Sequence, residues 1–151
     1  MSIFYQGTEV DILTKAEIIP NTAKTSIVRI NFGRWDNGIA GITIEHKLGA
    51  APNSVALVPC EWIDDAGVSV PMNAECAIET MNATFKNDGT RVQSSFTCYS
   101  SATKARTQST SADNAGIVAV DGEKVSLRSV GLNYYFTPNV DYFLICTRYE
   151  A

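Results

Sequence analysis

Residues 42–59 narrow the choice of fold more than any other part of the chain. Ile42, Ile44 and His46 alternate with polar residues, which is the period of two expected of a half-buried strand. Residues 47–54 then contain Gly, Pro and Asn, and each of these residue types favours a turn. An apolar run follows and ends the segment. We therefore predict two strands joined by a tight connection, paired with each other, that set the register for the rest of the fold.

The same kind of pattern recurs along most of the chain. Short strand-like segments are separated by Gly, Asn, Asp and Pro at regular spacing, which predicts about ten strands. We expect an all-β protein, an antiparallel β-sandwich of jelly-roll-like form. Further segments with a strand pattern are 25–32, 68–71, 83–85, 91–100, 116–128, 132–136 and 142–146.

Three hairpins are predicted in the second half. Residues 86–90 form a loop in which Gly89 can adopt a left-handed conformation, and the return strand would place Val92 on the face of Phe96. A turn at Asp121-Gly122 would pair Val118 with Val125 and set Gly116 opposite Leu127. The last hairpin joins 132–136 to 142–146, and its strands are apolar on both faces, as at the centre of a sandwich or at a subunit interface.

Two segments are less regular. Residues 73–82 are predicted as a strand because both flanks are strand-like, although Ala, Glu and Met favour helix and Asn73 could cap one. Residues 100–114 contain mostly Ser, Thr and Ala without periodicity. We predict a long loop there, either mobile or held by a partner.

The first 22 residues differ in composition from the rest, so we divide the chain into an N-terminal segment, 1–22, and a sandwich domain, 23–151. We expect an extended arm, or one edge strand with its connection. It would either close the sheet of its own domain or lie on a neighbouring copy. The apolar residues expected to bind a partner are Ile3, Phe4, Tyr5, Val10, Ile12 and Leu13.

Length and charge exclude several classes of function. A chain of 151 residues is long enough for one domain with a real core. Its net charge is −4 and its Lys and Arg residues are scattered, which argues against binding of nucleic acid. No apolar run approaches the roughly 20 residues that span a membrane, and the first residues lack the pattern of a signal peptide.

Cysteine and histidine usage bears on metals and on redox state. The four cysteines are far apart and form no Cys-x-x-Cys motif, so we expect buried thiols rather than disulfides in a protein made in the cytoplasm. His46 is the only histidine, which makes a transition-metal site improbable and leaves only an oxygen-ligand Ca²⁺ site open. We expect no cofactor and no metal.

No catalytic motif is present in the sequence. There is no Gly-x-Ser-x-Gly elbow, no phosphate-binding loop, and His46 is expected to be a surface or turn residue. The carboxylates Glu61, Asp64 and Asp65 near Trp62 could hydrolyse a glycoside, but Asp-Asp-x-Gly is first of all a turn. We therefore expect no enzymatic activity and no catalytic residues.

Aromatic side chains at turns and strand ends could bind a sugar by stacking. Trp35 lies beside the Asn37-Gly38 turn, Trp62 at a strand end, and Tyr99 before the Ser/Thr-rich segment. The alternative for each is packing in the core or in an interface.

Two blocks resemble known proteins. The run Ile-Glu-His-Lys-Leu-Gly-Ala-Ala-Pro-Asn-Ser-Val at 44–55 resembles a motif of tailed-bacteriophage virion proteins, in which a strand ends in His-x-Leu-Gly, followed by Pro and an apolar strand. The run Phe-Thr-Pro-Asn-Val-Asp-Tyr-Phe-Leu-Ile at 136–145 is similar to the terminal hairpin of small β domains in tail fibres, head fibres and capsid decoration proteins.

This resemblance implies a symmetric structural protein of the virion, most simply a homotrimer, assembled in the host cytoplasm. It suggests a capsid decoration protein or short spike that binds other capsid or tail proteins by surface complementarity. The alternative that it leaves open is a host-attachment module of a tail or head fibre that binds a surface glycan through Trp35, Trp62 or Tyr99.

Overall fold

The computed structural model describes residues 2–5, 8–11, 23–32, 39–60, 76–100, 102–110, 115–130, 134–137 and 140–149. Every regular element in these ranges is a strand, and the sheets pack as a sandwich, so the prediction of an all-β antiparallel sandwich is confirmed. The strands are β1 (Ser2–Tyr5), β2 (Thr8–Asp11), β3 (Lys24–Asn31), β4 (Ile39–Glu45), β5 (Ser54–Pro59), β6 (Cys76–Phe85), β7 (Arg91–Ser100), β8 (Ala105–Ser109), β9 (Ala115–Val120), β10 (Lys124–Val130), β11 (Tyr134–Phe136) and β12 (Asp141–Arg148).

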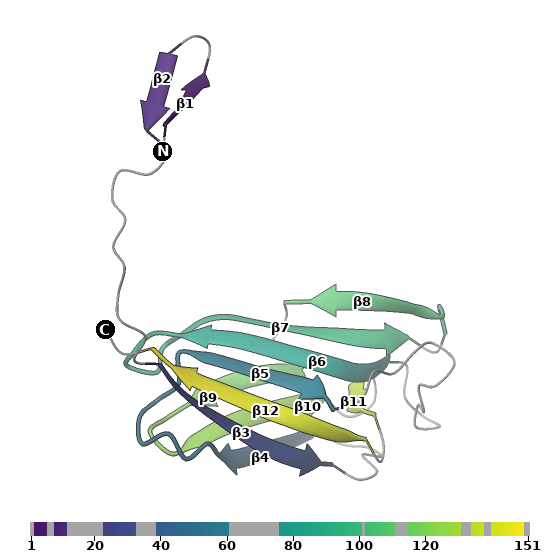
Figure 1. Ribbon diagram of the computed structural model, residues 1–151. Helices are drawn as coiled ribbons and strands as arrows, with labels where there is room; N and C mark the ends of the chain where they lie inside the picture. The colour runs from purple at the N-terminus through teal and green to yellow at the C-terminus, as the bar shows by residue number, and fades with distance from the viewer. Residues whose placement is uncertain are drawn as a thin grey trace.

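Two sheets form the body of the molecule (Figure 1). The larger sheet has the order β3-β12-β5-β6-β7-β8, with β11 added parallel to β6, and the smaller sheet has the order β4-β10-β9. The other ladders between described strands are antiparallel. The core lies between the sheets, and along β5 and β12 buried residues alternate with more exposed ones.

Large apolar side chains from both sheets meet in this core. Leu57, Ile78 and Leu144 of the larger sheet are fully buried, as is Ile117 of the smaller one. Each such side chain contributes roughly 1.5–3 kcal/mol relative to an exposed position. Phe32, which follows β3, stacks on Phe136 of β11, and the centroids of the two rings are 4.0 Å apart.

The predicted pairing within residues 42–59 is wrong, although both strands form. β4 pairs with β10 in the smaller sheet, whereas β5 lies between β12 and β6 in the larger sheet. The connection passes from one sheet to the other, with Lys47 (φ 62°) and Gly49 (φ 81°) in left-handed conformations. Local alternation shows which face of each strand is buried, but it does not choose the strand's partner.

The hairpin of β9 and β10 forms, but its predicted register is wrong. The Asp121 amide donates to the Lys124 carbonyl at 3.0 Å, so the two-residue turn is Gly122-Glu123, one residue later than predicted. Val125 pairs with Val120 instead of Val118. An irregularity then shifts the ladder between Ser126 and Leu127, which places Leu127 opposite Ile117.

The predicted terminal hairpin is also wrong, because β11 and β12 do not pair with each other. β11 runs parallel to the first residues of β6, and β12 lies between β3 and β5. The buried Tyr142 hydroxyl explains the arrangement locally: it donates to the Ile78 carbonyl of β6 and accepts from the Thr137 amide after β11. Burial raises the pKa of this hydroxyl above its usual value.

The two irregular segments have different outcomes. β6 confirms the strand predicted within residues 73–82 from Cys76 onward, and residues 73–75 lie outside the described ranges. The long loop predicted for residues 100–114 is wrong over Ala105–Ser109, which forms the edge strand β8 beside β7. Apart from Ala105 its residues are polar, and most are exposed, so no apolar alternation marks this strand in the sequence.

At the N-terminus β1 and β2 pair with each other in a two-stranded sheet of their own. This differs from the predicted alternative of a single edge strand in the domain's sheet. Ile12 and Leu13 lie outside the described residues, so the boundary placed at residue 22 stays a prediction.

Candidate functional site

The surface that stands out is the outer face of the larger sheet, turned away from the smaller sheet. Along β12, Tyr142, Leu144 and Cys146 are fully buried, while the alternate residues Phe143 and Ile145 point outward and are half-buried. Both faces of this strand are apolar, as noted in the sequence, and the two faces have different surroundings. One face fills the core, and the other forms part of the surface.

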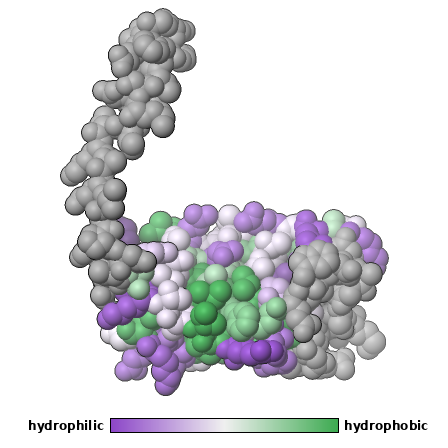
Figure 2. Space-filling model, viewed as in Figure 1, coloured by the Kyte–Doolittle hydropathy of each residue, from purple (hydrophilic) through white to green (hydrophobic). Residues whose placement is uncertain are grey.

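Five apolar side chains from three neighbouring strands form what we call the apolar strip. Ile145 stands between Ile27 of β3 and Ala56 of β5, and Phe143 stands opposite Val58. Ile27 is 63% exposed, and together with its neighbours it forms a contiguous apolar patch rather than a single exposed residue. Figure 2 shows a hydrophobic area in the middle of this face, over β3, β12 and β5.

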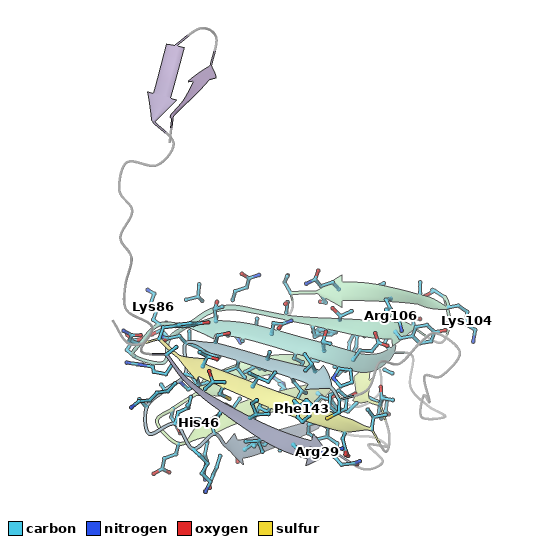
Figure 3. The ribbon with its side chains drawn as sticks, in the orientation of Figure 1. Arg29, His46, Lys86, Lys104, Arg106 and Phe143 are labelled. Carbon is cyan, nitrogen blue, oxygen red and sulfur yellow. The ribbon has the colours of Figure 1, made fainter. Side chains whose placement is uncertain are left out.

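A charged pair borders the apolar strip on the side of β3 (Figure 3). The Asp141 carboxylate accepts from the Asn31 amide and from Arg29 Nε, each at 2.8 Å. These bonds, from Asn31 first and then from Arg29, hold the pKa of Asp141 below its usual value. The Arg29 guanidinium also lies 5.9 Å from the ring centroid of Phe143, so it joins the polar border to the strip.

Beyond β5 the same sheet carries a polar hollow of about 260 Å³. Hydroxyl and amide side chains dominate its lining, among them Ser54, Asn82, Thr84, Gln93 and Ser95. These groups can donate and accept hydrogen bonds, but none of them is a base or an activated nucleophile.

A buried ion pair lies near the opposite edge of the larger sheet. Arg106 Nε of β8 donates to Glu79 Oε2 of β6 at 2.8 Å, and the side chain of Glu79 is only 9% exposed. Glu79 is the extra residue of a bulge, because the β6–β7 register shifts between Ile78 and Thr80. The Arg106 guanidinium lies 5.6 Å from the ring centroid of Tyr99. This pair holds three strands together.

His46 occupies the predicted turn but is fully buried, not at the surface. Its Nδ1 accepts from the Leu48 amide at 3.1 Å, and its Nε2 lies 2.9 Å from the Asp121 carbonyl, so Nε2 carries the proton. Nδ1 thus holds the β4–β5 connection locally, and Nε2 joins this connection to the β9–β10 turn. The geometry fits a structural role and leaves no nitrogen to act as a general base.

The structure describes only some of the residues singled out from the sequence. Ile3, Phe4, Tyr5 and Val10 lie on β1 and β2, whereas Ile12 and Leu13 lie outside the described ranges. Trp35, Trp62 and the carboxylates Glu61, Asp64 and Asp65 also lie outside them. Tyr99 is 4% exposed with Arg106 over its ring, an environment that does not favour sugar stacking.

All four cysteines are described, and none of them is in a disulfide. Cys98 and Cys146 are buried, as predicted, while Cys60 and Cys76 are half-buried. Burial raises the pKa of Cys146 to about 11, and the neighbouring Ser26 hydroxyl acts in the opposite direction to a smaller extent.

Sequence reasoning did not single out Ile27, Ala56, Val58 or Ile145. Their signal was present only in part, because the doubly apolar pattern of β12 indicated the centre of a sandwich or a subunit interface without showing which strands flank it. That β3 and β5 are these flanking strands follows from the sheet order.

Comparison with family models, with curated proteins and with solved structures finds no match to this chain. Within the described ranges, no helix has the length and apolar character needed to cross a membrane. The same residues contain no group of three or more His, Cys, Asp or Glu side chains placed to hold a metal ion.

Proposed function

We propose that this chain is a non-enzymatic structural protein of a bacteriophage virion, a capsid decoration protein or a short spike that acts by binding other copies of itself and the particle surface. The observation that carries the proposal is the apolar strip on the outer face of the larger sheet. The resemblance of residues 44–55 to phage virion proteins supports the location.

The strip has the composition of the centre of an interface. Protein interfaces have an apolar core within a polar rim, and a stable one buries about 800 Å² on each partner. Here Ile27, Phe143 and Ile145 would form the core, with Arg29 and Asp141 on the rim. Burying Ile27 alone would remove a large aliphatic side chain from water, which favours association.

The mass of the purified chain in solution, measured by light scattering, tests the association. We expect an oligomer, and we expect Ile27→Asp to dissociate it because a carboxylate in an apolar interface loses its hydration without a partner. Val92→Asp is the matched control: Val92 is also 63% exposed but lies outside the strip on β7. Equal effects of both substitutions would count against the strip as an interface.

Immunogold labelling of virions with antibodies against the chain tests the location on the particle. Label distributed over the head supports a decoration protein, and label at the tail tip supports the attachment alternative. Absence of the chain from purified virions would contradict the proposal.

The second candidate function is binding of a host surface glycan, and the polar hollow favours it. Amide and hydroxyl groups such as Asn82, Thr84 and Gln93 can bind sugar hydroxyls without any charged group. A glycan array tests this function: binding that is lost on Asn82→Ala or Gln93→Ala would place it in the hollow, and binding lost on Trp62→Ala would place it at the aromatic residue. No binding on the array would exclude the candidate for the glycans displayed.

A further inference from the structure

We propose that the β1–β2 hairpin of one copy covers the β3 edge and the apolar strip of a neighbouring copy. This inference rests on the proposed function and deepens it, because it names the segment that makes the contact between copies.

The receiving surface is regular and apolar. β3 is the outermost strand of the larger sheet's order, and its ladder with β12 continues through eight residue pairs from Lys24 to Asn31 without a bulge. An edge strand that is long, regular and partly apolar is a template for strands of another chain. The exposed Ile27 stands in the middle of this strand and begins the row that continues to Ile145 and Ala56.

The β1–β2 hairpin would in turn be stabilised by packing on such a surface. A two-stranded hairpin on its own is marginally stable at best in water, and β1 and β2 form a sheet only with each other. Their register sets Ile3 opposite Val10 and Tyr5 opposite Thr8, so these residues share one face of the hairpin. That face is predominantly apolar and requires a surface on which to pack.

The charges of the two segments are also complementary. The β2 sequence contributes Glu9 and Asp11, and β1 and β2 contain no basic residue. β3 contributes Lys24 and Arg29 and no acidic residue. Arg29 is bound to Asp141 just as Arg106 is bound to Glu79, so it is the apolar strip, and not charge, that favours docking of the hairpin on β3 over docking at β8.

The contact is assigned between copies because the single chain does not form it. β3 follows the hairpin after residues 12–23, yet β1 and β2 make no ladder with β3. A connection of this length could span at most about 40 Å, so it does not confine the hairpin to the β3 of its own chain. In a symmetric oligomer each copy would donate one hairpin and receive one, and such a head-to-tail contact forms a ring when the rotation between copies closes.

A mixing experiment with two full-length variants tests the inference. The strip variant, Ile27→Asp, keeps an intact hairpin, and the hairpin variant, Ile3→Asp with Val10→Asp, keeps an intact strip. We expect the unmodified chain to be oligomeric and each variant alone to be monomeric. An equal mixture should form a one-to-one dimer, because each pair has one intact hairpin and one intact strip.

Circular dichroism shows that each variant is folded, and Val92→Asp serves as the charge-matched control that keeps the oligomer. If the hairpin variant stays oligomeric while the strip variant is monomeric, strips pack on each other; the inference is then overturned and the proposed function stands. If both variants are monomeric and the mixture stays monomeric, the exchange is also refuted. A monomeric unmodified chain would overturn both the inference and the association on which the proposed function depends.

Discussion

Both edges of the larger sheet carry the same three groups: an arginine on the edge strand, a carboxylate that it binds, and an aromatic ring beneath its guanidinium. At the β3 edge these are Arg29, Asp141 and Phe143. At the β8 edge they are Arg106, Glu79 and Tyr99. The two sets differ in burial, since the arginine and carboxylate side chains are 63% and 34% exposed at β3 but 34% and 9% exposed at β8.

The difference in burial assigns different roles to the same chemistry. Asp141 lies on β12, the direct neighbour of β3, and its pair with Arg29 remains in contact with water. Glu79 lies on β6, two strands from Arg106, so this pair spans β7 and is largely withdrawn from water. An exposed pair contributes little to stability, whereas breaking a buried pair leaves a charge without compensation.

The two edge strands, β3 and β8, also differ in length and in polarity. β8 has five residues, four of them polar and most of them exposed, and short polar edges resist pairing with other chains. β3 has eight residues and presents Ile27 to the surface. The buried pair therefore lies at the short, polar edge, and the exposed pair borders the edge that we propose to be open to partners.

The largest expected effect is that of Arg106→Ala. It leaves the buried Glu79 carboxylate without its partner, and we expect a loss of about 2 kcal/mol in the free energy of unfolding, below the range for a fully buried pair because Arg106 is partly exposed. Urea unfolding followed by circular dichroism measures this loss. Adding Glu79→Gln to the same chain should recover part of it, and no recovery would show that the effect is not electrostatic.

Thiol labelling compares how readily the two edges open. Cys98 of β7 faces Thr107 of β8, and Cys146 of β12 faces Ser26 of β3. We expect Cys98 to react at least about tenfold faster with a thiol reagent, because the shorter β8 opens more readily and because burial raises the pKa of Cys146 to about 11.

The labelling is measured in a Cys60→Ser, Cys76→Ser background, so that only the two buried thiols react. Faster labelling of Cys146 than of Cys98 would contradict the expectation that the β8 edge opens more readily than the β3 edge.

Lowering the pH should remove the stabilisation that the exposed pair of Arg29 and Asp141 contributes. The pKa of Asp141 in the folded chain is below the ordinary value of 3.8, so its contribution to stability is present above about pH 4 and is lost as the pH falls through the lower, folded-state pKa. The difference in thermal midpoint between the unmodified chain and Asp141→Asn should therefore be constant from about pH 5 to about pH 7 and should shrink below about pH 4. A difference that grows in acid would contradict the assignment.

The smallest expected effect is that of Arg29→Ala on the stability of the isolated chain. The pair with Asp141 is exposed, so removing the guanidinium should give no resolvable change in the urea midpoint. The measurement is made beside Arg106→Ala at a concentration at which both chains are monomeric. A loss as large as that of Arg106→Ala would remove the distinction between the two edges.

Much of the secondary structure could be predicted from the sequence. The alternation at Ile42, Ile44 and His46 predicted β4, and its inward face is the more buried one. Gly89 has the left-handed conformation (φ 88°) predicted for its hairpin loop, and β12 is a strand with apolar residues on both faces, as its sequence pattern indicated. These features are local, since they depend on residues a few positions apart.

Bulges show where such reasoning fails. An extra residue at Glu79, at Val92 and at Val118 changes which side chains face the core, yet it leaves the composition of the strand unchanged. Val92 was predicted to share the face of Phe96, but it is 63% exposed because the β6–β7 register shifts beside it. The buried ion pair of Glu79 was missed for the same reason.

By itself, then, the sequence determined that the chain folds into strands, where most of them turn, and that β12 is apolar on both sides. Only the tertiary structure decided that β4 and β5 belong to opposite sheets, that β11 joins β6, and that Ile27, Ile145 and Ala56 form one row. The physical reason is that hydrophobic alternation specifies which face of a strand is buried. The neighbour on each side is chosen by contacts between distant residues, such as the bond from the Tyr142 hydroxyl to the Ile78 carbonyl.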